Sequence, residues 1–402
     1  MSYLIPFDEI PKKIIHTKSK TPDGREYYVV KFDKDYLSNY DESAGIYRSV
    51  VYSTMTQQLL AFTPPKTLPY RVEYLTAQPH DTILVNEWIE GTMITLFYDK
   101  EHHLWEMATK GAVGANYWYY RNQYVISRDN DSSVPPQPTF REMFIDAIGT
   151  DQFDEHFDAS RNYVFVLQHP ANHIVLDIKH PRVYLVAVYT ISENRAVFVS
   201  PNEYEKTEAS SGHSYNIHFP QRFEFRPDSY TTDLVEKYCS IHSDHRMVGL
   251  MFTNLHTGER MALENPRYSD VREIRGNHPN LQYQYLCLRS MGKVEEFTKL
   301  FPQYRELFWN FYMDFSKYVT NLHQSYVSYY VKKTGIQISK KYFPLIYKIH
   351  HQIYLPSLSH GKDDSGGTGA ATKTIIKRKV VLDFVNTLTP GELLFYLRQE
   401  AG

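Results

Sequence analysis

The segment Asn86-Glu87-Trp88-Ile89-Glu90-Gly91-Thr92-Met93-Ile94 decides how this chain is interpreted. It connects two runs of β-branched and aromatic residues, Ile83–Trp88 and Met93–Tyr98, through a Glu-Gly pair. Runs of this kind on either side of a turn residue are typical of β-strands. Trp88 ends the first run. Its indole has no basic lone pair and only a weak N–H donor, so it cannot act as a nucleophile.

Residues 1 to about 265 contain further β-branched and aromatic runs bounded by Pro, Gly, Asn and Asp, and each such run predicts a strand. These runs are Tyr27–Phe32, Ile46–Tyr52, Tyr163–Leu167, Ile174–Ile178, Val183–Ile191 and Val248–Thr253. One helix is expected over Thr139–Gly149, because Thr139 and Glu142 have the spacing of a capping box.

From about Leu281 the periodicity changes, and apolar residues recur every three or four positions, which indicates amphipathic helices. The recurring residues are Phe297, Leu300, Tyr304, Leu307, Phe308, Phe311, Phe315, Tyr318, Leu322 and Tyr326. Pro302 is expected in the first turn of a new helix, where its missing N–H costs nothing. We therefore predict a helical domain over residues 271–358.

The end of the chain reads as a linker followed by a short apolar tail. Residues 359–374 are rich in Gly, Ser and Asp and have almost nothing to bury, which predicts a flexible linker. Residues 375–402 include Val380, Val381 and Phe384, so we expect this tail to dock either on the chain's own body or on a partner.

The composition allows two or three domains and gives little global pull toward nucleic acid. The chain has 402 residues and a formal net charge of −2, so any basic binding surface must be local. Two cysteines suit a reducing compartment, and neither a signal segment nor a membrane-spanning run is recognisable. We expect a cytoplasmic protein, in an infected cell if it is viral. The 34 Tyr and 22 Phe suit base stacking or, more commonly, core packing.

Trp88-Ile89-Glu90-Gly91 resembles the nucleotidyltransferase motif Lys-x-Asp/Glu-Gly, with Trp88 at the lysine position. Other segments of the chain resemble further motifs of bacteriophage-type RNA ligases, and they occur in the same order as in those enzymes. These segments are Arg48–Tyr52, Ala61–Lys66, Gly91–Gly114, Tyr163–Val175, Met247–Phe252 and Gly258–Tyr268. The resemblance covers about residues 40–270. It implies an α+β fold, with an antiparallel nucleotidyltransferase-like β domain over residues 1–270 and an all-α C-terminal domain. The segment Val166-Leu-Gln-His-Pro170 also resembles a sequence found in a ligase-related protein group of large nucleocytoplasmic DNA viruses.

The departures from the ligase pattern all fall at positions that carry chemistry in that family. Trp88 replaces the lysine that attacks the nucleoside triphosphate, and Val166 and Val248 replace carboxylates. Ala262 and Glu264 replace the two lysines of a final Lys-x-Lys strand. Adenylyl transfer needs cations and a held Mg²⁺ to offset charge on the phosphate oxygens. The resemblance thus implies a pseudoenzyme without a cofactor.

What the resemblance implies for function is RNA binding without reaction, at the 5′ end or cap, in viral RNA processing or translation. The predicted RNA- or nucleotide-binding residues are Arg48, Lys66, Trp88, Glu90, Lys110, Asn172 and His173. Arg48, Lys66 and Lys110 would hold phosphate. Trp88 would offer a π face to a base, and a positively charged cap base would suit it. We expect RNA as one partner and a protein as another, bound through the C-terminal tail or the helical domain.

Two alternatives remain open. The chain can be a non-catalytic scaffold subunit of a complex, or an active nucleotidyltransferase whose nucleophile has moved to Lys66 or Lys110. A metal site at Cys239-x-x-His242-x-x-His245 lacks an obvious fourth ligand, so we predict none.

Overall fold

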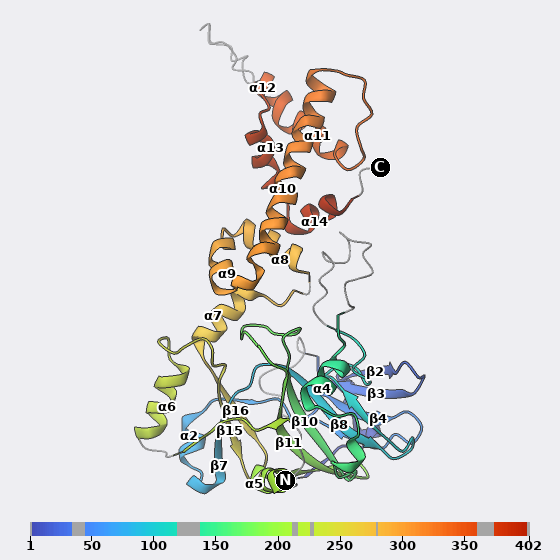
Figure 1. Cartoon of the computed structure of the whole chain (residues 1–402), viewed down its shortest axis with the longest axis vertical. Helices are drawn as coiled ribbons and strands as arrows, with labels where there is room; N and C mark the ends of the chain where they lie inside the picture. The colour runs from blue at the N-terminus through green and yellow to red at the C-terminus, as the bar shows by residue number, and fades with distance from the viewer. Residues whose placement is uncertain are drawn as a thin grey trace. The chain divides into compact units, whose positions relative to one another are not determined.

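A computed structural model of the chain describes residues 2–33, 45–118, 137–210, 216–225, 229–278, 280–359 and 374–399. The chain divides into two compact units. The sheet unit comprises residues 1–120 and 131–275, and the helical unit comprises residues 121–130 and 276–402. In Figure 1 the strands run from blue to yellow and the helical unit is orange to red. The expected boundary between residues 270 and 271 falls inside helix α7 (Pro266–Arg275).

The largest sheet of the sheet unit is antiparallel, apart from one short parallel pair between the strands β11 and β13. Its order is β1 (Ser2–Leu4), β12 (Arg195–Val199), β11 (Arg182–Ser192), β10 (Arg161–Gln168), β8 (Thr92–Asp99) and β9 (Leu104–Ala108), with β13 (Ile217–His218) beside β11. One face packs against α4 (Phe140–Ile148), through buried residues that include Phe144 and Phe165.

Two smaller sheets complete this unit. The first has the order β2 (Ile15–Lys20), β3 (Glu26–Lys31), β4 (Val50–Ser53) and β5 (Leu59–Phe62), and shares a core with the largest sheet. The second has the order β14 (Arg222–Phe223), β7 (Ile83–Glu87), β15 (Gly249–Asn254), β16 (Arg260–Glu264) and β6 (Leu68–Pro69). Leu75 of α2 (Val72–Thr76) and Leu234 of α6 (Ser229–Cys239) cover one face of this second sheet. Helix α5 spans Pro201–Ser210.

Most of the predicted strands and the predicted helix are confirmed. Helix α4 begins after Thr139, whose side chain and Glu142 form the expected capping box, and it ends at Gly149 with φ 86°. The strand expected over Ile174–Ile178 is wrong, because this segment is a loop. Its backbone N–H groups at Ile174, Val175 and Leu176 donate to the Glu90 carboxylate instead of to a neighbouring strand.

The three-to-four spacing is confirmed by α9 (Val294–Leu300) and α10 (Arg305–Tyr326). The other helices of this unit are α8 (Leu281–Ser290), α11 (Phe343–Ile349), α12 (Leu355–Ser359) and, in the tail, α13 (Arg378–Val385) and α14 (Pro390–Arg398). Pro302 opens a 3-10 turn, Pro302–Tyr304, that leads into α10. The aromatic residues expected on one face of α10 are buried, among them Phe308, Phe315 and Tyr326. Together with the sheets, these helices confirm the predicted α+β class.

The apolar tail docks on the chain's own helical unit. Val381, Val385 and Leu393 are buried, and α13 packs beside α10 (Figure 1). The Arg378 guanidinium on α13 donates hydrogen bonds to Thr320 Oγ1 at 3.2 Å and Ser316 Oγ at 3.0 Å on α10. Residues 360–373 of the predicted linker lie outside the described part. Among the described residues no single helix is long and apolar enough to cross a bilayer, although α13 and α14, bent by 119°, meet that test as a pair.

Candidate functional site

Trp88 lies at a cavity of about 100 Å³ between the largest sheet and the sheet that contains β7. The cavity is lined by Arg48, Thr67, Asn86, Glu87, Trp88, Ile89, Met93, Val166, Val186, Pro220, Met251, Thr253 and Arg260. Its volume is below the roughly 300 Å³ at which pockets for whole small-molecule ligands begin. Met93 and Val166, which are paired in the register of β8 and β10, line the cavity with apolar side chains.

The two glycines of the ligase-like elements are required by close packing around the cavity. A Cβ at Gly91 would lie 2.3 Å from the Leu167 carbonyl oxygen, and one at Gly249 would lie 2.1 Å from the Leu263 carbonyl oxygen. Neither contact is possible for a larger residue. The Trp88 N–H donates to the Gly249 carbonyl at 2.9 Å, so the two glycine elements are joined directly beside the tryptophan.

Strand alternation determines which side chains of β15 and β16 face the cavity. Leu250 and Phe252 are buried in the core under α2 and α6, whereas Met251 and Thr253 line the cavity. On β16, Arg260 pairs with Thr253 and lines the cavity as well. Arg260 was absent from the predicted set. Its position two residues before Ala262 on the same strand is the signal that would have identified it.

Positive charge dominates the polar lining of this cavity. Arg48 and Arg260 are half-buried, and neither has a carboxylate partner in the part of the chain that the structure describes. Burial and the charge of Arg260 lower the pKa of Arg48 to about 10, and burial also lowers the pKa of Arg260. Both guanidinium groups still carry their charge at neutral pH. Burial raises the pKa of the Glu87 carboxyl, which disfavours the only negative charge among the lining residues.

Two buried polar atoms at the cavity lack a hydrogen-bond partner among the described residues. They are Arg260 Nε and Asn86 Oδ1, although Arg260 Nη2 donates to the Pro65 carbonyl at 3.4 Å. Buried polar atoms are usually paired, and an unpaired one costs about 1–3 kcal/mol. The two guanidinium groups can therefore attract a small anionic group, whereas Asn86 Oδ1 is an acceptor and needs a hydrogen-bond donor.

Glu90, predicted to contact nucleotide, is buried and holds the protein's own backbone. Its carboxylate accepts hydrogen bonds from the N–H groups of the loop at Ile174–Leu176, and from the Tyr268 hydroxyl at 2.9 Å. Its carbonyl accepts from Gln168 Nε2 at 2.9 Å. The structure does not bring Glu90 to the cavity lining, and its geometry is that of a structural carboxylate.

The other predicted residues are distributed differently around the sheet unit. Arg48 and Trp88 line the cavity, but Lys66 is exposed, and its neighbour Thr67 takes the lining position. The Lys110 ammonium lies 4.8 Å from the centre of the Phe32 ring. Asn172 Nδ2 donates to Thr92 Oγ1 at 2.8 Å and so ties its loop to β8. His173 Nδ1 lies 2.9 Å from the Pro170 carbonyl oxygen. The roles predicted for Lys66, Lys110, Asn172 and His173 stay predictions.

Of the five positions that depart from the ligase pattern, the structure brings Trp88 and Val166 together at the cavity. Ala262 lies on the same face of β16 as Arg260, opposite Met251 in the register. Glu264 follows on that face and pairs with Arg272 at 3.4 Å. Val248 is buried directly before β15. The carboxylate-to-valine replacements thus sit at packed positions.

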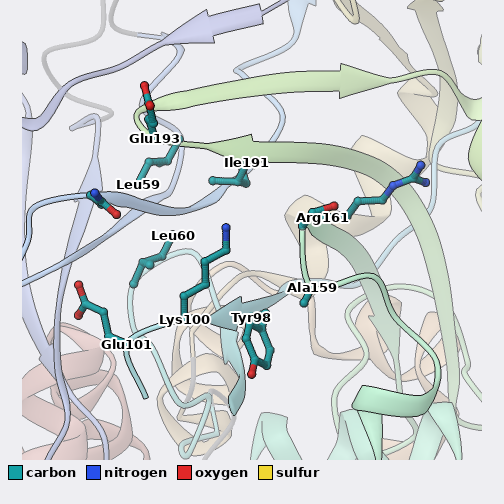
Figure 2. Close-up of a pocket in the computed structure, with 11 residues that line it drawn as sticks. Leu59, Leu60, Tyr98, Lys100, Glu101, Ala159, Arg161, Ile191 and Glu193 are labelled. Carbon is teal, nitrogen blue, oxygen red and sulfur yellow. The ribbon is translucent and has the colours of Figure 1, made fainter. Parts of the chain in front are cut away.

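A second, smaller pocket of about 60 Å³ lies where the ends of β8, β10 and β11 meet β5. Figure 2 shows the Lys100 side chain reaching toward Ile191 across this pocket. Charged groups of both signs line it, and Arg161 is paired with Glu203 at 3.1 Å. Its size and its mixed charge do not suit a nucleotide.

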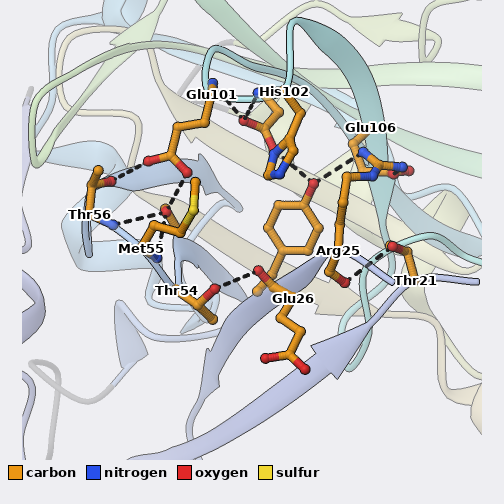
Figure 3. A network of polar contacts seen from close by, with 12 residues as sticks. Thr21, Arg25, Glu26, Thr54, Met55, Thr56, Glu101, His102 and Glu106 are labelled. Carbon is orange, nitrogen blue, oxygen red and sulfur yellow. Dashed lines mark hydrogen bonds and ion pairs between the residues drawn. The ribbon is translucent and has the colours of Figure 1, made fainter. Parts of the chain in front are cut away.

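A polar network beside this pocket joins β3 to the β8–β9 hairpin (Figure 3). The Tyr27 hydroxyl donates to Asp99 Oδ2 at 2.7 Å, and Arg25 pairs with Glu106 at 2.8 Å. Asp99, Glu101 and His102 place possible metal ligands within 4.8 Å of one another. The Asp99 carboxylate, however, already accepts hydrogen bonds from Tyr27, from two backbone N–H groups and from the His102 ring, which makes the network structural.

Solved structures that are similar to this chain are ATP-dependent ligases. A putative DNA ligase from Aquifex aeolicus has 13% identity and a TM-score of 0.43, covering 79% of this chain and 77% of that chain. An archaeal RNA ligase has 10% identity and a TM-score of 0.42, covering 67% and 61%. An RNA ligase from Naegleria gruberi has 12% identity and a TM-score of 0.34, covering 53% and 59%. No family model matches the chain.

Among curated proteins, the chain is similar to the immediate-early protein ICP-46 homolog of Invertebrate iridescent virus 6. The identity is 23% over 206 residues, which cover 50% of this chain and 42% of that protein. The chain thus matches less than half the length of this viral relative. Ligases and viral proteins are the two groups that the sequence resembles.

Proposed function

We propose that this chain is a catalytically inactive RNA-ligase-like protein that binds the 5′-phosphate end of an RNA without forming a covalent bond. The observation that carries the proposal is the pair Arg48 and Arg260, without carboxylate partners in the described chain, beside Trp88 at the lysine position. Keeping two like charges half-buried is unfavourable unless an anion offsets them. A phosphate is the anion that guanidinium groups hold best.

The cavity favours a terminal phosphate over a cap base. A methylated cap base carries positive charge, and the two guanidinium groups at the cavity would repel it. The space of about 100 Å³ is also small for a whole base. Trp88 then serves as an apolar wall beside the phosphate, and a base can stack on the face of its indole ring only if the cavity widens.

The helical unit supplies a second, less specific attraction for RNA. Between Phe315 and Ser359 there are six lysines and neither aspartate nor glutamate. Three large aromatic side chains in this stretch are exposed, namely Tyr329, Phe343 and Tyr347. Lysines attract the phosphate backbone, and exposed aromatic rings stack on bases without regard to sequence. We propose that such binding serves viral RNA processing or translation.

The test is binding of 5′-phosphorylated, 5′-hydroxyl and capped forms of one short RNA, measured by fluorescence anisotropy at a fixed salt concentration. Arg260→Met should weaken binding of the phosphorylated form about tenfold or more, because a charge-assisted hydrogen bond is lost. Trp88→Ala should have a smaller effect in the same direction. Arg246→Met is a matched control, since Arg246 is exposed and pairs with Asp244 in its own loop.

The proposal fails if the phosphorylated and hydroxyl RNAs bind equally well to the wild-type protein and Arg260→Met changes neither. Preference for capped RNA would restore the cap hypothesis and assign the base, instead of the phosphate, to the cavity. Preference for the phosphorylated form, lost in Arg260→Met and retained in Arg246→Met, supports the site as described.

The scaffold alternative is favoured by one observation on α10. Trp309, Tyr312 and Met313 are exposed at positions three and four residues apart, so they form one apolar stripe. A protein partner bound through the helical unit would cover this stripe. Replacing Trp309 and Met313 by serine should then release the partner and leave binding of phosphorylated RNA unchanged. Loss of RNA binding in this variant would count against a separate protein surface.

A further inference from the structure

The helical unit contains a polar cavity of about 310 Å³ that the ligase-like site does not use. Its walls come from α8, α10, the segment before α11, and α14. They are formed by Gln282, Asp314, Lys317, Tyr318, Asn321, Lys341, Tyr342 and Leu397. This volume lies at the lower end of the range for pockets that bind small molecules, and it is about three times that of the cavity beside Trp88.

One buried hydroxyl in this cavity has no partner. Tyr318 is only 3% exposed, and its hydroxyl oxygen makes no hydrogen bond with any described residue. Its ring is held firmly, because the Tyr342 ring lies 5.5 Å away at 33° and the Lys341 ammonium lies 5.8 Å from the ring centre. An unpartnered buried hydroxyl on a residue that lines a cavity gains a hydrogen bond where a ligand in the cavity reaches it.

Further donors lie among the other residues that line the cavity. The Lys341 ammonium donates to the Leu397 carbonyl at 3.0 Å and retains two other hydrogens. Burial lowers the pKa of Lys341, while the charge of Asp314, which lines the same cavity, acts to raise it. Asn321 Nδ2 donates to the Tyr342 hydroxyl oxygen at 3.4 Å, so the hydrogen of that hydroxyl remains for another acceptor. Lys317 is exposed at the rim.

The cavity is lined by several groups that can donate hydrogen bonds to an anion and by one carboxylate that can only accept them. Two lysines and two tyrosine hydroxyls can donate to phosphate oxygens, whereas the Asp314 carboxylate can only accept. A bare phosphate would gain from the donors but would be repelled by Asp314. A ligand that carries both a phosphate and hydroxyl groups satisfies both sides, because a sugar hydroxyl can donate to the carboxylate.

We propose that this cavity binds a phosphorylated sugar, with its phosphate held by Lys317, Lys341 and the Tyr318 hydroxyl and a sugar hydroxyl donating to Asp314. The ligand lies against α14 through Leu397, so its binding also fixes the C-terminal helix on α10. A free sugar phosphate and a 5′-terminal nucleotide share this chemistry. Ribose 5-phosphate is therefore the probe, and uridine 5′-monophosphate distinguishes the two sources.

The experiment is isothermal titration of the full chain with ribose 5-phosphate, ribose and inorganic phosphate, accompanied by thermal melts. Ribose 5-phosphate should bind at least about tenfold more tightly than phosphate, and ribose should not bind detectably. Tyr318→Phe should weaken ribose 5-phosphate about tenfold while the melting temperature of the free protein stays the same or rises, because an unpaired hydroxyl is removed. A hydroxyl with only a structural role would not give these opposite effects.

Two further variants separate the two sides of the cavity. Asp314→Asn should weaken ribose 5-phosphate and should tighten inorganic phosphate, since a repulsive charge is lost. Lys340→Gln, next to Lys341 but exposed and outside the lining, is the matched control and should bind like the wild-type protein. Tighter binding of uridine 5′-monophosphate than of ribose 5-phosphate would identify a nucleotide as the source, and equal binding would identify a free sugar phosphate.

The proposal is overturned if ribose 5-phosphate does not bind, or if it binds equally to wild type, Tyr318→Phe and Asp314→Asn. It is also overturned if Arg260→Met abolishes the binding, because the ligand would then occupy the cavity beside Trp88. A failure of this kind leaves the RNA-binding proposal standing, since that proposal depends on a different cavity in the other unit.

Discussion

The two units of this chain carry opposite charge. The sheet unit, residues 1–120 and 131–275, contains 26 lysines and arginines against 36 aspartates and glutamates, a formal net charge of −10. The helical unit, residues 121–130 and 276–402, contains 18 against 10, a formal net charge of +8. The whole-chain value of −2 therefore conceals a basic helical unit. A near-neutral total says little about nucleic-acid binding when the charges of each sign are separated along the chain.

The units also differ in how they use their polar groups. In the sheet unit the ligase-like elements keep the residues that packing needs, such as Gly91, Gly249 and Glu90, while Trp88 and Val166 stand at reactive positions. In the helical unit the lysines are concentrated in a stretch without acidic residues. Under the proposed function, the sheet unit binds the phosphate end through Arg48 and Arg260, and the lysines of the helical unit attract the RNA backbone. This contrast predicts end specificity in one unit and general affinity in the other.

The largest expected effect tests whether the sheet unit retains Glu90 for structure. Glu90→Ala should lower the free energy of unfolding by about 4 kcal/mol, because it leaves the Ile174–Leu176 N–H groups and the Tyr268 hydroxyl without their buried acceptor. Urea unfolding followed by circular dichroism measures this. Glu155→Ala, at an exposed carboxylate, should change stability by less than about 0.5 kcal/mol. Equal effects of the two substitutions would return Glu90 to the set of ligand-binding candidates.

A smaller loss is expected at Asp99, whose carboxylate ties β3 to the β8–β9 hairpin. Burial acts to raise the pKa of Asp99, but hydrogen bonds from Tyr27 and His102 hold it below its ordinary value. A carboxyl with a depressed pKa stabilises the fold above its unfolded pKa, and this stability is lost as the pH falls through the folded value. Asp99→Asn should therefore cost about 2–3 kcal/mol at pH 7 and much less near pH 3.

The measurement is urea unfolding of wild type and Asp99→Asn at several pH values between 3 and 7. A difference between the two proteins that is independent of pH would show that the charge of Asp99 contributes nothing. The network would then depend only on the shape and hydrogen bonds of the side chain, which asparagine partly reproduces.

The basic surface of the helical unit is tested by Lys332→Gln combined with Lys333→Gln, since both lysines are exposed. The double variant should weaken phosphorylated, hydroxyl and capped RNA by the same factor, about three- to tenfold, and should reduce the dependence of affinity on salt. Anisotropy titrations at two or more salt concentrations measure both effects. If the factor differs between RNA ends, the division of roles between the two units is wrong.

The sequence predicts most of this fold because strand and helix signals are local. Runs of β-branched and aromatic residues predict β10 and β11, and the Thr139–Glu142 spacing predicts α4 with its N-terminal cap. The loop at Ile174–Ile178 escapes prediction, because the acceptor for its N–H groups is Glu90, which lies more than 80 positions earlier. No local pattern can indicate that a buried carboxylate replaces a neighbouring strand.

The candidate site is predictable only in part, for a similar reason. Arg48 and Trp88 reach the cavity, as the resemblance implies. Lys66 does not, because the chain turns so that its neighbour Thr67 faces inward. Arg260 reaches the cavity because β16 places every second side chain on that face, which requires the strand's register against β15. Pairing between strands distant in sequence sets that register, so it appears only in the structure.

The smallest expected effect is on catalysis, where restoring one residue should achieve nothing. Trp88→Lys returns an amine to the position of the ligase nucleophile, but the adjacent Val166 cannot hold a metal ion, and Ala262 and Glu264 still replace two cations. Incubation with labelled ATP or GTP and Mg²⁺ should give no covalent nucleotide adduct with either wild type or Trp88→Lys. An adduct on the wild-type protein would establish a relocated nucleophile. An adduct on Trp88→Lys alone would mean that the missing lysine is the only reason why the sheet unit is inactive. The other departures from the ligase pattern would then not prevent nucleotide transfer.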